Sequence, residues 1–246
     1  MEKERLDILV QRQTGVARAQ AQGLIRTGRV RAQDGRLLDK PGVRLPVETM
    51  FQIDEGARYV SRGGQKLEAA LAAFKLDVTG AVAIDAGAST GGFTDCLLQH
   101  GAARVYAVDV GYGQLAWTLR QDARVVVLER VNARTLDPAG LPETPTVATV
   151  DVSFISLTLV LPAVAAAVAP GGTIVALVKP QFEVARDAVG KGGVVRDPVA
   201  RAAAVARVGA AAAALGLAVA GTAESVLPGP KGNREVFLRL HRARAS

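Results

Sequence analysis

The sequence is poor in the residues that build disulfides and metal centres. Cys96 is the single cysteine among 246 residues, so the chain cannot form an internal disulfide, which is typical of a protein in the reducing cytoplasm. The two histidines, His100 and His241, lie far apart along the chain. Because zinc sites need several Cys or His ligands at close spacing, we expect no metal site.

The sequence also lacks a long uninterrupted apolar run. Its first 13 residues are charged and hold no apolar core of the kind that a secretory signal needs. Residues 156–178 are long and apolar enough to cross a bilayer, but Pro162 lies inside this stretch and a Pro-Gly-Gly turn signal follows at residues 170–172. We therefore expect a buried helix, a turn and a buried strand there, and no membrane partner.

Acidic residues are fewer than basic ones. The 30 Lys and Arg exceed the 23 Asp and Glu, which gives a net charge of +7 and a pI of about 10.0. This balance favours an anionic partner, most often nucleic acid, although a basic protein can also be merely soluble. The length suits one large domain, or a medium domain beside a small one.

The first 50 residues differ from the rest of the chain. They contain ten basic residues, eight of them arginine, against six acidic ones. Apolar residues recur at helical spacing in residues 5–13 and 17–28, and the Asp-Gly pair at residues 34–35 is typical of a hairpin turn. We expect two short helices and a small sheet that bind RNA phosphates, a solvated charged face being the alternative. The candidate RNA-binding residues are Arg5, Arg18, Arg26, Arg29 and Arg31, with Arg58 just beyond.

Strand and helix patterns alternate after residue 60. This alternation predicts an α/β fold with a mostly parallel sheet and helices on both faces. In such sheets, ligands bind at the carboxyl ends of the strands. The expected strands are residues 81–85, 104–109, 125–130, 146–151, 173–178, 217–224 and 235–240.

A glycine-rich loop follows the first of these strands. Its spacing is that of a P-loop, but Phe93 stands where that loop needs lysine, which argues against a nucleotide triphosphatase. It also matches the dinucleotide pattern, except that Ser89 replaces the middle glycine and leaves less room for a pyrophosphate. A cofactor without phosphates, such as S-adenosylmethionine, suits the loop better, and an NAD enzyme remains the runner-up. The candidate cofactor-binding residues here are Asp85, Gly87, Ser89, Gly91, Gly92 and Phe93.

Polar residues also stand at the ends of later strands. Asp109 ends the second strand and can accept hydrogen bonds from ribose hydroxyls, while Asn132 lies past the third and can read an adenine edge. Asp151 and Lys179 end the next two strands, so their charges converge on the same crevice, where buried charges need partners. A structural salt bridge is the alternative interpretation of these charges.

Six stretches, in order, resemble the motifs of one family: SRGGQKLEAAL, DAGASTGGFTDCLL, DVGYGQLAW, DVSFISL, LVKPQFE and GNREVFL. The chain resembles the TlyA family of ribosomal RNA 2′-O-methyltransferases, which are also labelled hemolysins, and its second part is similar to the FtsJ class. The resemblance implies an S4-like RNA-binding domain over residues 1–56, a linker over residues 57–60, and a Rossmann-like class I methyltransferase domain over residues 61–246.

The FtsJ class carries a Lys-Asp-Lys-Glu tetrad, which falls here on Lys66, Asp151, Lys179 and Glu235. The resemblance implies S-adenosylmethionine as the methyl donor and a cytidine 2′-hydroxyl as the acceptor. Lys179 would accept the hydroxyl proton or stabilise the developing alkoxide, and Asp151 would orient Lys179 beside the methyl group. Lys66 and Glu235 would complete the charge network and position the ribose.

The chain stops soon after its last expected strand, which resembles the shorter subtype of the family. We therefore expect large-subunit ribosomal RNA, or the large subunit itself, as the partner. Two other functions stay open: a membrane-lytic hemolysin, and an RNA-binding assembly factor whose enzyme domain is inactive.

Overall fold

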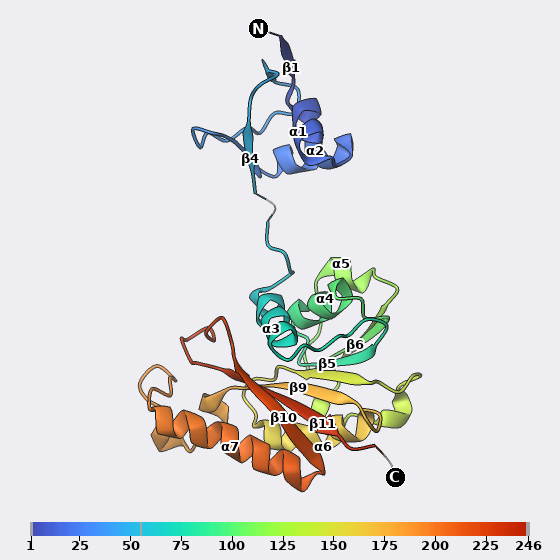
Figure 1. Cartoon of the computed structure of the whole chain (residues 1–246), viewed down its shortest axis with the longest axis vertical. Helices are drawn as coiled ribbons and strands as arrows, with labels where there is room; N and C mark the ends of the chain where they lie inside the picture. The colour runs from blue at the N-terminus through green and yellow to red at the C-terminus, as the bar shows by residue number, and fades with distance from the viewer. Residues whose placement is uncertain (1, 55, 245–246) are drawn as a thin grey trace. The chain divides into compact units, whose positions relative to one another are not determined.

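The computed structural model describes residues 2–54 and 56–244 and divides the chain into two compact units, Met1–Arg58 and Tyr59–Ser246 (Figure 1). Tyr59 was expected in a linker, but its side chain is buried in the second unit and lies against the backbone of Gly64. The second unit therefore begins two residues before the expected boundary.

The first unit has the two short helices predicted from the apolar spacing. They pack together over a small core that includes Leu6, Val10, Ile25 and Phe51. The strands form two separate two-stranded antiparallel sheets, β1–β3 and β2–β4, where one small sheet was expected. The elements are β1 (Lys3–Arg5), α1 (Leu6–Thr14), α2 (Arg18–Arg26), β2 (Val30–Ala32), β3 (Arg44–Pro46) and β4 (Phe51–Ile53).

The second unit holds a seven-stranded sheet in the order β10-β11-β9-β8-β5-β6-β7. β11 runs antiparallel to both of its neighbours, β10 and β9, and every other pair in the sheet is parallel, so the predicted mostly parallel α/β fold is confirmed. The strands are β5 (Val82–Ala86), β6 (Arg104–Asp109), β7 (Val125–Glu129), β8 (Val147–Val150), β9 (Thr173–Val178), β10 (Leu217–Glu224) and β11 (Val236–Arg242).

Helices cover both faces of this sheet, because alternate strand residues are apolar on both sides (Figure 1). One face packs against α3 (Arg62–Ala73), α4 (Gly92–Gln99) and the short α5 (Trp117–Arg120). The other packs against α6 (Leu157–Ala167) and α7 (Pro198–Ala214).

The apolar stretch over residues 156–178 forms α6, a turn and β9, as predicted. Pro162 lies inside α6 and does not end it. Of the helices in the described part of the chain, none combines the length and the apolarity that crossing a membrane would require.

The strand order reverses between β5 and β8. Chain connections run from β5 outward through β6 and β7 on one side, and from β8 to β9 on the other. Such a reversal leaves a crevice at the carboxyl ends of the two central strands. The residues that follow these ends are Gly87 and Asp151.

Candidate active site

The glycine loop begins at Gly87, directly after the end of β5. Gly87 has a φ of 87°, and a Cβ there would lie 2.5 Å from the backbone oxygen of Asp151. Its backbone N–H donates to Val108 in β6 at 2.8 Å. Only glycine has both the required conformation and the required size at this position. The loop can therefore lie against the ends of β6 and β8 at once.

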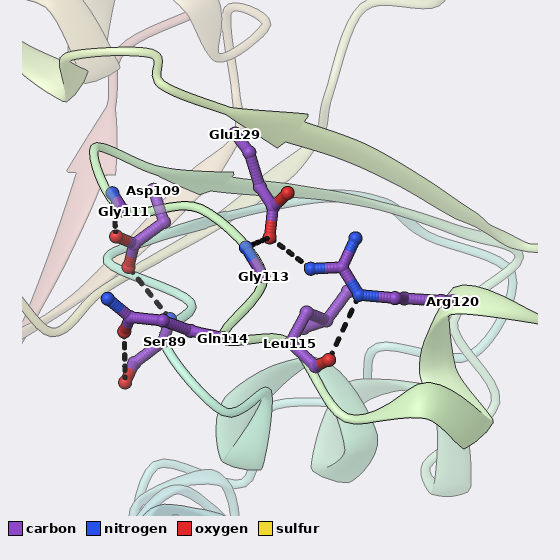
Figure 2. A network of polar contacts seen from close by, with 8 residues as sticks. All are labelled: Ser89, Asp109, Gly111, Gly113, Gln114, Leu115, Arg120 and Glu129. Atoms are coloured by element: carbon purple, nitrogen blue, oxygen red, sulfur yellow. Dashed lines mark hydrogen bonds and ion pairs between the residues drawn. The ribbon is translucent and has the colours of Figure 1, made fainter.

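Asp109 ties this loop to the end of β6. Its carboxylate accepts hydrogen bonds from the backbone N–H of Ser89 at 2.8 Å and from that of Gly111 at 2.7 Å, as Figure 2 shows. The side chain of Gln114 reaches the same place, since its oxygen accepts from the Ser89 hydroxyl at 3.3 Å. The Asp109 carboxylate thus connects the glycine loop after β5 to the loop after β6.

A cavity of about 490 Å³, which we call the Asp109 cavity, opens beside this carboxylate. Its volume lies within the range of about 300–1,000 Å³ that is usual for small-molecule sites. The Asn132 side-chain oxygen accepts from the backbone N–H of Arg134 at 3.1 Å, which fixes the amide at the cavity wall. The lining includes Gly87, Ser89, Val108, Asp109, Gln114, Val131, Asn132, Ala133, Arg134, Asp151, Val152, Ser153, Phe154, Ile155 and Val160.

A second cavity of similar size is lined by all four residues of the predicted tetrad, Lys66, Asp151, Lys179 and Glu235. We call it the Lys66 cavity. Lys66 on α3 and Glu235, just before β11, form an ion pair of 2.7 Å, although 169 residues separate them in the sequence. Their side chains are only 8% and 0% exposed, so the pair is shielded from water. The lining also includes Ser61, Arg62, Gly63, Ala88, Thr90, Gly92, Phe93, Pro230, Asp151 and Lys179.

The other ion pair in this cavity joins the ends of β8 and β9. The Nζ of Lys179 lies 2.7 Å from Oδ1 of Asp151 and donates to the Ser153 hydroxyl at 2.8 Å. Both side chains of the pair are mostly buried. The lysine nitrogen thus contacts a carboxylate and a hydroxyl, and an ammonium group has three N–H donors, so one is available to meet a substrate oxygen.

The two cavities share Gly87, Ser89, Asp151 and Ser153. A molecule in the Asp109 cavity and another in the Lys66 cavity would therefore meet beside the Lys179–Asp151 pair. This arrangement suits a group transfer between two bound molecules, because placement of the reacting atoms supplies much of the rate in such reactions.

Two residues expected at the cofactor site lie elsewhere. Asp85 is fully buried under the loop and lines neither cavity; it accepts hydrogen bonds from the hydroxyls of Thr94 at 2.7 Å and Thr149 at 3.1 Å. Gly91 likewise faces the side chains of Leu115 and Leu119. Both residues therefore shape the loop from behind. The other expected residues, Gly87, Ser89, Gly92, Phe93, Asp109, Asn132 and Asp151, line one cavity or both.

Burial raises the pKa of Asp85 to about 7, from an ordinary value of 3.8. The folded chain therefore keeps a proton that the unfolded chain releases, and ionisation of Asp85 opposes folding as the pH rises. Asp85→Asn cannot ionise. We therefore expect the free energy of unfolding of the variant, relative to that of the wild type, to increase as the pH rises from 5 to 8.

Urea unfolding at both pH values checks this expectation. The exposed Asp77, whose pKa is lowered by the Thr79 hydroxyl, gives a control: Asp77→Asn has no such trend. A stability difference between Asp85→Asn and the wild type that is the same at both pH values would contradict it.

Several residues of the site were not predicted from the sequence. Gln114 and Arg134 line the Asp109 cavity, and Ser153 binds Lys179. Phe154 also lines the Asp109 cavity, yet its side chain is 92% exposed and its φ is 65°. Ser153 and Phe154 lie two and three residues after Asp151, within the DVSFISL motif, and this closeness to the strand end was the signal by which they could have been found.

The first unit places the candidate RNA-binding arginines in different settings. Arg5 and Arg18 both pair with the fully buried Asp7, at 3.0 Å and 3.1 Å. Arg29 donates to the backbone oxygen of Asp54 at 2.6 Å, and Arg31 donates to that of Gly35 at 3.1 Å. Arg26 and Arg58 are exposed. The structure thus brings Arg5 and Arg18 together on one carboxylate.

The chain was also compared with known proteins. Residues 59–242 match the model of the FtsJ-like methyltransferase family. The chain is 50% identical to a 16S/23S rRNA (cytidine-2′-O)-methyltransferase, TlyA of Mycobacterium tuberculosis, over 94% of this chain and 87% of that protein. It is 35% identical to a 23S rRNA (cytidine-2′-O)-methyltransferase, TlyA of Campylobacter jejuni, over 73% and 69% of the two chains.

Solved structures agree with these matches. A structure from Streptococcus thermophilus that carries the label hemolysin is 45% identical, with a TM-score of 0.75 over 99% of this chain and 90% of that one. A Burkholderia thailandensis N-methyltransferase is only 19% identical, with a TM-score of 0.52 over 74% and 79% of the two chains, and shows likeness of fold alone. The chain therefore belongs to the FtsJ-like methyltransferase family, and within it to the TlyA group.

Proposed function

We propose that this protein transfers a methyl group from S-adenosylmethionine to the 2′-hydroxyl of a cytidine in ribosomal RNA. One observation carries the proposal: two ion pairs, Lys66–Glu235 and Lys179–Asp151, line one cavity, and that cavity meets the Asp109 cavity beside Asp151. The relatives described above act on the same chemical group, which supports this assignment.

The Asp109 cavity fits S-adenosylmethionine in size and in the order of its chemical groups. The Asp109 carboxylate can accept from the two ribose hydroxyls, as carboxylates at this strand end do in related folds. Beyond it, Val131 and Ala133 form an apolar wall with the Asn132 amide, which suits a flat adenine ring. The glycine loop offers close backbone approach to the amino-acid end.

A nicotinamide dinucleotide fits this loop less well. Its pyrophosphate needs loop N–H groups that point at it. Here the N–H of Ser89 is already bonded to the Asp109 carboxylate. S-adenosylmethionine has no phosphates and makes no such demand.

Lys179 acts as an ammonium group in this proposal. It lies between Asp151 and Ser153, and a positive charge there stabilises the negative charge that develops on the ribose 2′-oxygen. The proton of the 2′-hydroxyl passes to water as the new oxygen–methyl bond forms. When bound, the cofactor supplies a methyl group on a positively charged sulfur. Asp151 keeps Lys179 aimed at the junction of the cavities, where the acceptor oxygen must lie for an in-line attack.

Lys66 and Glu235 hold the acceptor ribose. One carboxylate oxygen of Glu235 binds Lys66, and the other is buried without a hydrogen-bond partner in the described structure. Buried acceptors without a partner are costly, so a donor is expected there when substrate binds. A ribose hydroxyl supplies that donor.

Two features support RNA as the acceptor. Phe154 presents an exposed aromatic ring, 92% accessible, beside the reaction site, and unstacked RNA bases lie on such rings. The first unit, which we propose to be S4-like, offers Arg5 and Arg18 to phosphates, because Asp7 fixes both guanidinium groups while leaving them partly exposed.

Removal of one of these arginines should weaken RNA binding uniformly. We expect Arg18→Ala to lower the affinity for ribosomal RNA and to reduce the slope of log affinity against log salt by about one. Filter binding over a series of salt concentrations measures both. Arg36→Ala, which removes a more exposed charge from the same unit, is the control and should leave the slope unchanged. An equal loss in both variants would show that only net charge matters.

Large-subunit RNA is the substrate that both kinds of relative share, and we propose it here. The test is methyl transfer from labelled S-adenosylmethionine to isolated large and small ribosomal subunits. Label in the large subunit supports the proposal, and label in both widens it to the small subunit. Cofactor binding without any transfer would favour a non-catalytic RNA-binding factor, and leakage of liposomes instead would favour the membrane-lytic function.

A further inference from the structure

The loop between β6 and α5 forms part of the wall of the Asp109 cavity. Its Gln114 side chain lines the cavity and accepts a hydrogen bond from the Ser89 hydroxyl, so it bridges to the glycine loop. The Gln114 amide lies directly over the Cα of Gly111, where any side chain would collide with it. Gln114 is thus placed where it touches a bound donor.

A charged pair outside the cavity holds this loop. Glu129 ends β7, and its Oε1 accepts from the backbone N–H of Gly113 at 2.9 Å (Figure 2). The same oxygen pairs with Arg120 on α5, whose Nε donates to the backbone oxygen of Leu115 at 3.0 Å. The residues on both sides of Gln114 are therefore fixed by one ion pair.

Glu129 is ionised in this arrangement. The Arg120 guanidinium, together with the backbone N–H groups of Gly113 and Gln114, holds the pKa of Glu129 below its ordinary value. Glu129 lines neither cavity, so any effect that it has on a bound molecule passes through the loop.

We propose that Gln114 contacts the methyl donor and that Glu129 and Arg120 are positioning residues, which act on donor binding through Gln114. The inference rests on the proposed function, because it takes S-adenosylmethionine as the molecule in the Asp109 cavity. It assigns a donor contact to Gln114, which lies within the DVGYGQLAW motif, and indirect roles to Glu129 and Arg120, which lie outside the motifs.

A double-mutant cycle tests whether Glu129 acts on donor binding through Gln114. The dissociation constant of S-adenosylmethionine is measured by calorimetry for the full-length wild type, Gln114→Ala, Glu129→Gln and the double variant. We expect Gln114→Ala to weaken binding about tenfold, the usual cost of one hydrogen bond of this kind. Glu129→Gln should weaken it by about fivefold alone and add nothing in the double variant, because Gln114 is already gone.

Steady-state kinetics give a second measurement, which separates a positioning role of Glu129 from a purely structural one. In Glu129→Gln the KM for S-adenosylmethionine should rise, while kcat and the KM for RNA stay within about twofold of the wild type. Asp122→Asn is the matched control. It breaks a similar pair, Asp122–Arg124 at 2.7 Å, at the other end of the same strand, and should leave the KM for S-adenosylmethionine unchanged.

Independent, additive effects of the two substitutions would overturn the proposed route, as would unchanged binding in either variant. A fall in thermal stability of Glu129→Gln with an equal loss of RNA affinity would also overturn it, because that pattern means general unfolding. A wild type that binds no S-adenosylmethionine would instead overturn the proposed function and this inference with it.

Discussion

Replacement of Lys179 by alanine is expected to lower kcat for methyl transfer by about 100- to 10,000-fold, the range for loss of a group that stabilises charge or moves a proton in a transition state. The reason is geometric: Nζ of Lys179 lies in the Lys66 cavity, 2.7 Å from Asp151, and Asp151 lines both cavities. Lys179 does not line the Asp109 cavity, so the affinity for S-adenosylmethionine should stay within about twofold of the wild type.

Single-turnover transfer to ribosomal subunits and calorimetry with the cofactor make this measurement. Lys179→Arg distinguishes the two chemical roles of the lysine. Arginine keeps the positive charge and cannot accept a proton at neutral pH, so it should retain more activity than alanine if Lys179 acts by its charge. Activity of Lys179→Ala within tenfold of the wild type would contradict the assigned role.

Loss of Glu235 is expected to destabilise the second unit by about 3–5 kcal/mol, the usual cost of leaving one partner of a buried ion pair without the other. Lys66 is only 8% exposed, so without Glu235 its ammonium group would be left mostly buried and without its carboxylate partner. Urea unfolding of Glu235→Ala, followed by circular dichroism, gives the change in the free energy of unfolding.

The double variant Lys66→Met with Glu235→Leu separates stability from catalysis. Apolar residues of similar volume often replace a buried ion pair with little loss of stability. We expect this variant to recover most of the free energy of unfolding and yet to transfer no methyl group, because the acceptor ribose has lost both partners. A destabilisation of Glu235→Ala below about 1 kcal/mol would contradict the burial of the pair.

The positions of Asp109, Asp151 and Lys179 could be predicted from the sequence, because each ends or directly follows an apolar strand. In a parallel sheet the carboxyl ends of neighbouring strands lie together, so residues at those ends converge. Lys66 and Glu235 could not be placed by that rule. The family resemblance assigned both residues to the tetrad, and the structure shows that they form an ion pair although 169 residues separate them in the sequence.

Asp85 shows where the same rule fails. The expected strand ended at residue 85, but β5 runs to Ala86, so Asp85 lies within the strand and not after it. Successive side chains of a strand point to opposite faces, and a shift of one residue is enough to turn a carboxylate from the crevice into the core. Its two hydroxyl partners then hold it there.

Loop contacts lay beyond sequence reasoning for a different reason. Gln114 and Ser153 have no periodic pattern around them, and their roles depend on which loops meet in space. The ion pair of Asp7 with Arg18 is another such contact. Asp7 has the sequence position of an ordinary acidic residue in the first turn of α1, and it meets Arg18 only because α1 packs on α2.

The position of the methyl group in the product distinguishes 2′-O-methylation from methylation of a base. Ribosomal RNA is labelled with S-adenosylmethionine by the wild-type protein and then hydrolysed with alkali. A methyl group on a 2′-oxygen blocks cleavage of the next phosphodiester bond, so the account predicts label in an alkali-resistant dinucleotide that begins with cytidine. Label released entirely as mononucleotides would place the methyl group on a base and contradict the account.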